Sequence, residues 1–172
     1  MISQEYKNKV IDMFNQSGMC FTQSEVNNIE YADFGLNNIE SEGLNLIIYE
    51  NNERYCAKEM VLLPGQICPE HKHPTINGVL GKQETFRCRK GSVYLFVEGE
   101  DTGLYNDISL PEGKQKYYTV KNGIFLKEGE QFTIKPDTKH WFVSGKEGAV
   151  ISEFSSTSHD DTDIFTDPEI IR

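Results

Sequence analysis

The sequence is short of basic residues and has no long apolar run. Lys and Arg number 17 against 27 Asp and Glu, which gives a formal net charge of −10. Because nucleic acids and anionic membranes attract basic surfaces, this charge argues against both as partners. No apolar stretch is long enough to cross a bilayer, and the polar beginning MISQEYKNKV lacks a signal-peptide core. We therefore expect a cytoplasmic protein.

Cysteine is also scarce, and the four cysteines are widely spaced at Cys20, Cys56, Cys68 and Cys88. No C-x-x-C pair occurs, so the sequence indicates neither a zinc knuckle nor a redox pair. We expect reduced, mostly buried thiols. At 172 residues the chain can bury a sizeable core without disulfides or a structural metal. Any metal site that it holds is therefore free to serve a function.

The amino-terminal part has helical periodicity. Apolar residues recur at helical spacing over residues 3–17, between Ser3, a typical N-cap, and Gly18, a typical stop. A second start signal is the capping-box pattern TQSE at Thr22, whose periodicity fades before Gly35. The pattern predicts one or two short helices.

From residue 44 onward, short runs of β-branched and aromatic residues alternate with turn residues such as Lys90-Gly91 and Ser144-Gly145. About nine such runs at this spacing predict an all-β sandwich or barrel. The runs are LNLIIYE, YCAKEMVLL, ETFRCRK, SVYLFVE, KYYTV, GIFL, QFTI, HWFVS and AVISEF. We expect one domain over residues 1–172, with a helical segment over 1–35, a β-barrel over 44–155 and an acidic loop or tail over 156–172.

The stretch GQICPEHKHP contains two of the four histidines, His71 and His73, one residue apart. In an extended segment both side chains point the same way, because strand side chains alternate with a period of two. In the run ETFRCRK the same alternation places Glu84 on the apolar face with Phe86 and Cys88. A lone carboxylate inside a barrel is costly, whereas a bound cation compensates it.

The fourth candidate ligand is His140 in KHWF, which alternation places beside Phe142 and opposite Trp141. Three imidazoles and one carboxylate form a mixed nitrogen and oxygen shell that suits Mn, Fe, Co, Ni or Zn better than Mg or Ca. The alternative is that the H-x-H pair lies in a surface loop and His140 bonds backbone in the core. We expect His159 to be a solvated tail residue.

The spacing of these ligands resembles the first motif of the cupin superfamily, which reads G, five residues, H-x-H, a few residues, E, six residues, G. Gly65, His71 and His73 match its first part, and Glu84 and Gly91 match its last part. The ten residues between His73 and Glu84 exceed the usual gap, so a longer turn must join the two strands.

The second cupin motif resembles GEQFTIKPDTKH, in which the separation of Gly129 and His140 agrees with the family. Pro136 lies one place late, and the usual turn glycine is replaced by Asp137 or, counted from the proline, by Thr138. The resemblance implies a single cupin β-barrel, or jelly roll. A cupin barrel does not by itself fix a function, because the fold hosts several.

Further segments resemble bacterial D-lyxose isomerases over approximately residues 44–167. They are Lys58, EHKHP, Lys82-Gln83-Glu84, PDTKHWF, ISEFSS and DDTDIF. The resemblance implies a homodimeric aldose–ketose isomerase for D-lyxose and D-xylulose and, by similar chemistry, for D-mannose and D-fructose. It implies a divalent ion, with Mn²⁺ the usual choice, which would chelate two adjacent sugar oxygens and polarise the carbonyl.

Such a reaction moves a proton between adjacent carbons, and Glu153 is the candidate carboxylate that carries it. In AVISEF it shares a face with Ala149 and Ile151, on what we expect to be the strand after His140. Lys58 shares a face with Met60 and Leu62, and could stabilise negative charge on a substrate oxygen. The alternatives are an outward Glu153 and a Lys58 that extends to the surface.

Three more residues are candidates for sugar binding. Lys82 lies two places before Glu84 and shares its face if no bulge intervenes, while Asp163 and Phe165 could close over the pocket, as could Asp161. The acidic tail could equally be solvated.

Three other functions compete with the sugar isomerase. A cupin sugar-phosphate isomerase would need a cationic cradle, but alternation turns Arg87 and Arg89 away from Glu84. An iron-dependent cupin dioxygenase uses similar ligands to activate oxygen. A non-catalytic sugar-sensing cupin would act through another protein, because the sequence has no basic patch for DNA.

Overall fold

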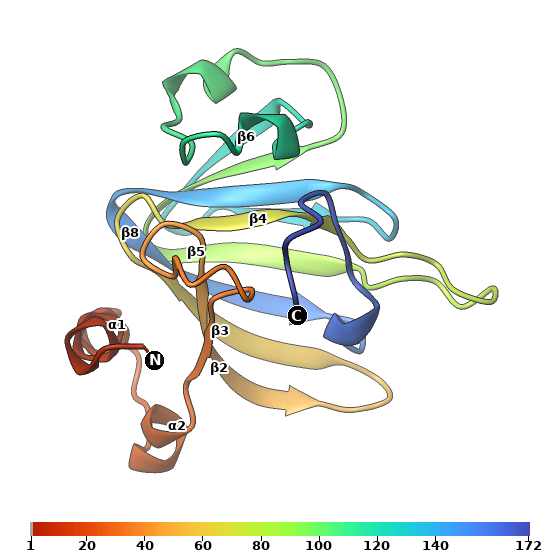
Figure 1. Ribbon diagram of the computed structural model, residues 1–172. Helices are drawn as coiled ribbons and strands as arrows, with labels where there is room; N and C mark the ends of the chain where they lie inside the picture. The colour runs from red at the N-terminus through yellow and green to blue at the C-terminus, as the bar shows by residue number, and fades with distance from the viewer. Residues whose placement is uncertain (1) are drawn as a thin grey trace.

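The computed structural model describes residues 2–172, so Met1 of the expected domain lies outside the described residues. Within them the chain forms two α-helices, three short 3-10 helices and nine strands (Figure 1). The helices are α1 (Gln4–Gln16), α2 (Gln23–Asn27), η1 (Leu104–Asp107), η2 (Gln115–Tyr117) and η3 (Asp160–Thr162). The strands are β1 (Glu30–Ala32), β2 (Leu44–Asn51), β3 (Cys56–Leu62), β4 (Ile67–Lys72), β5 (Glu84–Val97), β6 (Asn122–Lys127), β7 (Gln131–Ile134), β8 (His140–Ser155) and β9 (Ile164–Phe165).

The two longest strands, β5 and β8, pair antiparallel along their whole length, from Glu84 opposite Ser155 to Val97 opposite His140. The pairing shifts register on both sides of Gly91, whose φ of 73° and contact with the Gly148 carbonyl leave no room for a Cβ. The ribbon folds over at this point, and its two ends therefore come together at one site. The predicted turns at Lys90-Gly91 and Ser144-Gly145 are therefore wrong: the chain bends, but each strand continues.

The folded ribbon contributes to two layers. In one layer, β8 pairs with β3, which continues to β2 and β1, and β5 pairs with β7. In the other layer, β8 pairs with β4, and β5 pairs with β6. Apolar side chains from both layers, including Leu46, Met60, Phe86 and Phe142, fill the space between them. This confirms the predicted all-β cupin barrel.

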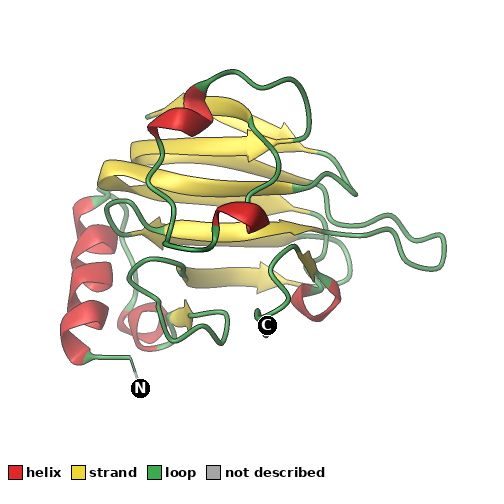
Figure 2. Cartoon of the chain, turned by 45° about the horizontal axis from the view of Figure 1, so that its top comes forward, coloured by secondary structure: helices red, strands yellow, loops and turns green. Residues whose placement is uncertain are grey.

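The amino-terminal helices form where the sequence predicts them. Ser3 caps α1, and Tyr6, Val10 and Phe14 bury its apolar face against the outside of β3. Thr22 and Glu25 form a complete capping box at the start of α2. Both helices lie at the end of the barrel opposite the loop that joins β4 to β5 (Figure 2). No helix within residues 2–172 is long and apolar enough to span a bilayer.

The run KYYTV was predicted to be a strand, and this prediction is wrong. It forms η2 and irregular backbone that crosses the outer face of the second layer. There the Tyr118 ring packs edge-on against Trp141, whose indole nitrogen donates a hydrogen bond to the Val120 carbonyl. The aromatic residues that suggested a strand are instead used to cover the buried indole of Trp141.

Strands also occur in two segments for which none was expected. Within residues 1–35, β1 pairs with β2, and within residues 156–172, β9 pairs with β4. The carboxylate of buried Glu70 accepts a hydrogen bond from Thr166, and Lys114 forms ion pairs with Asp167 and Glu169. The carboxy-terminal segment is therefore docked on the barrel and is not a free tail.

Candidate metal centre

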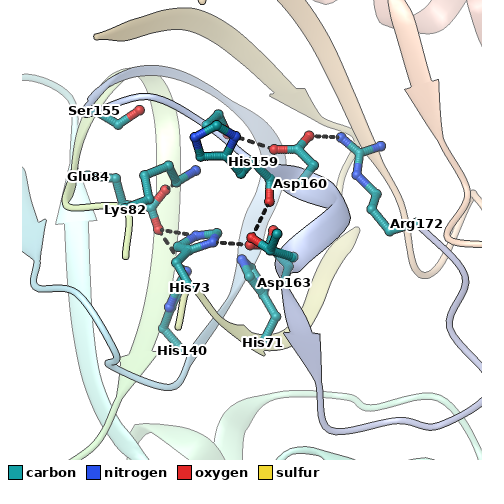
Figure 3. A network of polar contacts seen from close by, with 12 residues as sticks. His71, His73, Lys82, Glu84, His140, Ser155, His159, Asp160, Asp163 and Arg172 are labelled. Atoms are coloured by element: carbon teal, nitrogen blue, oxygen red, sulfur yellow. Dashed lines mark hydrogen bonds and ion pairs between the residues drawn. The ribbon is translucent and has the colours of Figure 1, made fainter. Parts of the chain in front are cut away.

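His71, His73, Glu84 and His140 come together at one site (Figure 3). His71 lies in β4 directly opposite His140, the first residue of β8, while Glu84 begins β5. Each offers one ligand atom, and these four atoms all lie within 4.8 Å of one another. All four residues are buried. The structure thus brings together all four residues that the sequence predicted as ligands.

The ring orientations of His71 and His140 are each fixed by the backbone carbonyl two residues earlier in the chain. His71 Nδ1 lies 2.8 Å from the Pro69 carbonyl oxygen, and His140 Nδ1 lies 2.9 Å from the Thr138 carbonyl oxygen. A carbonyl only accepts, so the proton of each neutral ring is assigned to Nδ1. The Nε2 lone pair of each ring then faces the centre of the cluster.

Glu84 is the only carboxylate of the four, and its two oxygens have different neighbours. Oε1 lies 2.8 Å from His140 Nε2 and 3.2 Å from His73 Nε2. Oε2 forms a 2.7 Å ion pair with the ammonium of Lys82. Burial acts to raise the pKa of Glu84, but Lys82 and the two histidines outweigh it and hold this pKa well below its usual value.

The histidines differ in their proton affinity in the absence of a cation. Burial, together with His140 and His73, holds the pKa of His71 well below its ordinary value. For His73, burial acts to lower the pKa, but Glu84 and Asp163 dominate and raise it to about 9. A divalent ion would take the place of that proton, because a ligating imidazole must be neutral on its ligating nitrogen.

The residues present fit a divalent cation. His140 Nε2 is buried and has no hydrogen-bond partner among residues 2–172, although it lies close to a carboxylate oxygen. A lone pair facing an anionic oxygen is unfavourable unless a cation lies between them. Three imidazole nitrogens with one carboxylate favour a transition metal over Mg²⁺ or Ca²⁺. The donor set does not select one metal among them.

Both departures from the cupin spacing have a structural explanation. The long connection from His73 to Glu84 is a loop that projects from the barrel (Figure 1). Asp137 occupies the left-handed turn with a φ of 60°, so it, and not Thr138, replaces the usual turn glycine. Its carboxylate accepts hydrogen bonds from the backbone and hydroxyl of Thr75. The two departures, the long loop and the turn residue Asp137, are therefore hydrogen-bonded to each other.

Glu153 points into the barrel, beside the four ligands. It lies in β8 between Lys58 of β3 and Phe86 of β5, the residues opposite it in the two neighbouring strands. The expectation that it follows His140 on a separate strand is wrong, because both belong to β8 and the folded ribbon brings them to one site. The side chain is buried at 3% exposure.

Two buried lysines contact Glu153. The Lys82 ammonium lies 3.0 Å from Glu153 Oε1 and bridges this oxygen to Glu84. The Lys58 ammonium lies 3.8 Å from the same oxygen, and neither lysine reaches the surface. Burial acts to lower the pKa of Lys82, but the carboxylates of Glu153 and Glu84 outweigh it and raise this pKa. Lys82 thus shares the inner face with Glu84, as the sequence suggested.

These side chains line one pocket, whose cavity volume is about 40 Å³. Arg87 and Arg89 do not line it, in agreement with the predicted alternation. The polar residues of the wall are His71, His73, Glu84, Glu153, Lys58, Lys82, Asp160, Asp163 and Arg172, and its apolar residues include Phe34, Leu46, Met60, Cys68 and Phe165.

The carboxy-terminal segment supplies four of these residues. Asp163 and Phe165 lie at the pocket, as expected, with Asp163 Oδ1 2.5 Å from His73 Nδ1. Sequence analysis missed Asp160 and Arg172, which form an ion pair of 2.6 Å. Asp161, which was named instead, is exposed and outside the pocket wall. His159 is exposed, as expected.

Comparison with known proteins identifies the relatives of this chain. The family model described as D-lyxose isomerase matches residues 25–172. The chain belongs to the D-lyxose isomerase family. It is 55% identical to the D-lyxose/D-mannose isomerase of Thermosediminibacter oceani, over 98% of this chain and 93% of that protein. It is 53% identical to the D-lyxose ketol-isomerase of Cohnella laeviribosi, over 98% and 92% of the two chains.

Membership of this family confirms the predicted enzyme class, an aldose–ketose isomerase. Among solved structures, the L-ribose isomerase of Acinetobacter sp. DL28 in complex with L-ribose has a TM-score of 0.77 at 17% identity, covering 96% of this chain and 91% of that chain. The L-ribose isomerase of Cellulomonas parahominis with L-psicose also has a TM-score of 0.77 at 17% identity, with coverages of 98% and 94%. At this identity the likeness establishes the fold alone.

Proposed function

We propose that this protein is a metal-dependent isomerase that interconverts D-lyxose and D-xylulose and also D-mannose and D-fructose. One observation carries the proposal: the buried cluster of three histidines and Glu84 is joined through Lys82 to a second buried carboxylate, Glu153. A cation site beside a carboxylate is what a proton transfer next to a carbonyl requires. The name of one curated relative includes D-lyxose and D-mannose, and the name of the other includes D-lyxose, which supports the choice of these two aldoses.

The reaction removes a proton from the carbon next to the sugar carbonyl, passes through an enediolate and returns the proton to the neighbouring carbon. His71, His73, Glu84 and His140 would hold the divalent ion, which supplies positive charge to polarise the carbonyl and stabilise the enediolate. We assign the proton transfer to Glu153, a buried carboxylate outside the ligand cluster that Lys82 joins to Glu84.

The two buried lysines have different roles in this proposal. Lys82 holds the carboxylates of Glu84 and Glu153 at fixed separation, with contacts of 2.7 and 3.0 Å, and so orients the base toward the ligand cluster. Lys58 lies on the other side of Glu153, 3.4 Å from the Ser158 hydroxyl. From there its ammonium can donate a hydrogen bond to a sugar oxygen and stabilise developing negative charge. Phe165 and the apolar wall exclude water from the site.

The charges of the pocket favour a free sugar over a sugar phosphate. A phosphate needs a cation that is available to pair with it. Lys82 is already paired with Glu84 and Glu153, and Arg172 is paired with Glu30 and Asp160. Lys58 lies near two of the same carboxylates. A phosphorylated substrate would have to displace these ion pairs, so we propose that the enzyme selects the unphosphorylated sugar.

Three further features stay at the level of proposal. We propose Mn²⁺ as the native metal, on the resemblance to the family; the mixed donor set accepts this ion among other transition metals. We propose a homodimer that buries exposed aromatic residues, among them Tyr49, Tyr55 and Phe154, which are 45%, 48% and 49% exposed. The cytoplasmic location remains a prediction.

The decisive experiment strips the purified protein with a chelator, reloads it with Mn²⁺ and incubates it, both with and without oxygen, with D-lyxose, D-mannose, D-xylose or their phosphates. We expect metal-dependent ketose formation from free D-lyxose and D-mannose. Ketose formed only from the phosphates would favour a sugar-phosphate isomerase. Turnover that requires oxygen would favour a dioxygenase, and sugar binding without turnover would favour a sensor. Each of these results would overturn the proposal.

A further inference from the structure

The three histidines of the metal centre are not oriented in the same way. His71 and His140 each direct Nδ1 to the carbonyl oxygen two residues earlier in the chain. His73 instead directs Nδ1 to the carboxylate of Asp163, ninety residues later, at 2.5 Å. Figure 3 shows Asp163 on the side of the His73 ring away from Glu84. One ligand is therefore held by a segment that lies outside the strands carrying the ligands.

That segment contacts the metal centre at a second point. Asp163 lies between η3 and β9, and β9 pairs with β4 so that Phe165 lies opposite His71. The Phe165 ring centroid is 5.3 Å from that of His71. The Asp163 side chain is only 9% exposed. The segment thus touches two of the four ligands, and it would lose both contacts if it left the barrel.

We propose that Asp163 is a positioning residue for His73, and that metal binding and docking of residues 157–167 stabilise each other. The proposal rests on the proposed function, because it requires a divalent ion in the four-residue site. The Asp163 carboxylate accepts the Nδ1 proton, which fixes the ring rotation and leaves Nε2 free to ligate the ion. Because coupling between two events is reciprocal, an ion that holds His73 in place also favours the docked segment.

Other contacts hold the segment without involving the metal centre. Thr166 donates to the Glu70 carboxylate, and Asp167 pairs with Lys114 at 2.6 Å. Asn51 donates to the Ser158 carbonyl and accepts from its backbone amide. These contacts flank Asp163 on both sides. In a variant that lacks the Asp163 carboxylate, these contacts therefore still attach the segment to the barrel.

The matched pair of variants is Asp163→Ala and Asp161→Ala. Asp161 lies two residues away on the same segment, is exposed, and makes no side-chain hydrogen bond or ion pair with the residues that the structure describes. Loss of a partner that orients a ligand typically weakens metal binding by about 10- to 100-fold. We expect a Mn²⁺ dissociation constant weakened by that factor in D163A and unchanged in D161A, measured by calorimetry without sugar. D163E, which restores a carboxylate, should recover part of the loss.

The reciprocal effect is measured by hydrogen exchange of the backbone amides in residues 157–167. In the wild-type chain Mn²⁺ should slow this exchange, and in D163A the same degree of metal occupancy should slow it less. Equal Mn²⁺ affinity in D163A and D161A, or exchange that Mn²⁺ does not change in the wild type, would overturn the inference and leave the isomerase proposal standing. A wild-type chain that binds no Mn²⁺ or other divalent transition metal would overturn both.

Discussion

The folded β5–β8 ribbon and the carboxy-terminal segment supply opposite walls of one pocket by different means. The ribbon sets Glu84, His140 and Glu153 through strand pairing, in which each side chain's direction follows from its register. The segment sets Asp160 and Asp163 through ion pairs and hydrogen bonds, with only two residues of strand. We therefore propose that the ribbon supplies the group that transfers the proton, whereas the segment adjusts metal and substrate binding.

The largest effect should come from the ribbon. Glu84→Gln removes the only anionic ligand and leaves buried Lys82 with one carboxylate partner fewer. We expect Mn²⁺ affinity to fall by more than the roughly 10- to 100-fold loss that is typical of a partner outside the ligand set, and turnover to be lost with it. The melting temperature should fall as well, since breaking a buried ion pair destabilises a fold. Calorimetry measures the losses of Mn²⁺ affinity and of melting temperature, and a ketose assay measures the loss of turnover.

Glu59→Gln is the matched control for that change. Glu59 is a buried carboxylate of β3, but it lies outside the pocket and accepts a hydrogen bond from the Ser152 hydroxyl. We expect wild-type Mn²⁺ affinity and turnover. If E59Q and E84Q bind Mn²⁺ equally well, the cluster is not the metal site.

Glu153→Gln should separate chemistry from metal binding. General acid–base catalysis contributes about 10²- to 10⁴-fold, so kcat should fall by that factor while Mn²⁺ affinity stays close to the wild-type value. Solvent deuterium should no longer enter the sugar at the carbon next to the carbonyl. Retained exchange of that hydrogen in E153Q would remove Glu153 from the proposed role.

A smaller effect is expected from the segment. Arg172→Met removes a guanidinium that lines the pocket and pairs with Glu30 and Asp160 at 2.5 and 2.6 Å. We expect KM for D-lyxose to rise about five- to tenfold, the equivalent of about 1 kcal/mol, with little change in kcat. Lys114→Met breaks ion pairs of the same segment outside the pocket and should leave KM unchanged. An unaltered KM in R172M would show that the ion pairs of Arg172 stabilise the segment without contributing to substrate binding.

The smallest effect concerns acid stability. Burial acts to raise the pKa of Asp160, but Lys58, Ser158 and Arg172 outweigh it and hold this pKa below its ordinary value. A depressed carboxyl pKa stabilises the fold above the unfolded-state pKa, near roughly pH 4, and this contribution is lost as the pH falls further. Asp160→Asn should therefore lower the free energy of unfolding by about 1 kcal/mol at pH 7 and by less at pH 3. Urea unfolding in chelator at both pH values measures it; a constant difference would contradict the assignment.

The same comparison shows what the sequence could reveal. Period-two alternation is a local property, so it correctly placed His71, Glu84 and Glu153 on inward faces. It could not show that the ribbon folds over at Gly91, because a bend and a turn carry the same residues. Asp160 and Arg172 were missed because the segment has no periodicity, and its position depends on contacts with residues far away in the chain.

The most direct test of the central claim is anomalous diffraction at the manganese absorption edge from crystals of the chain loaded with Mn²⁺. We predict one strong peak per chain, surrounded by His71, His73, Glu84 and His140 and next to Glu153. A strong peak at another place, or no peak among these four side chains, would contradict the account.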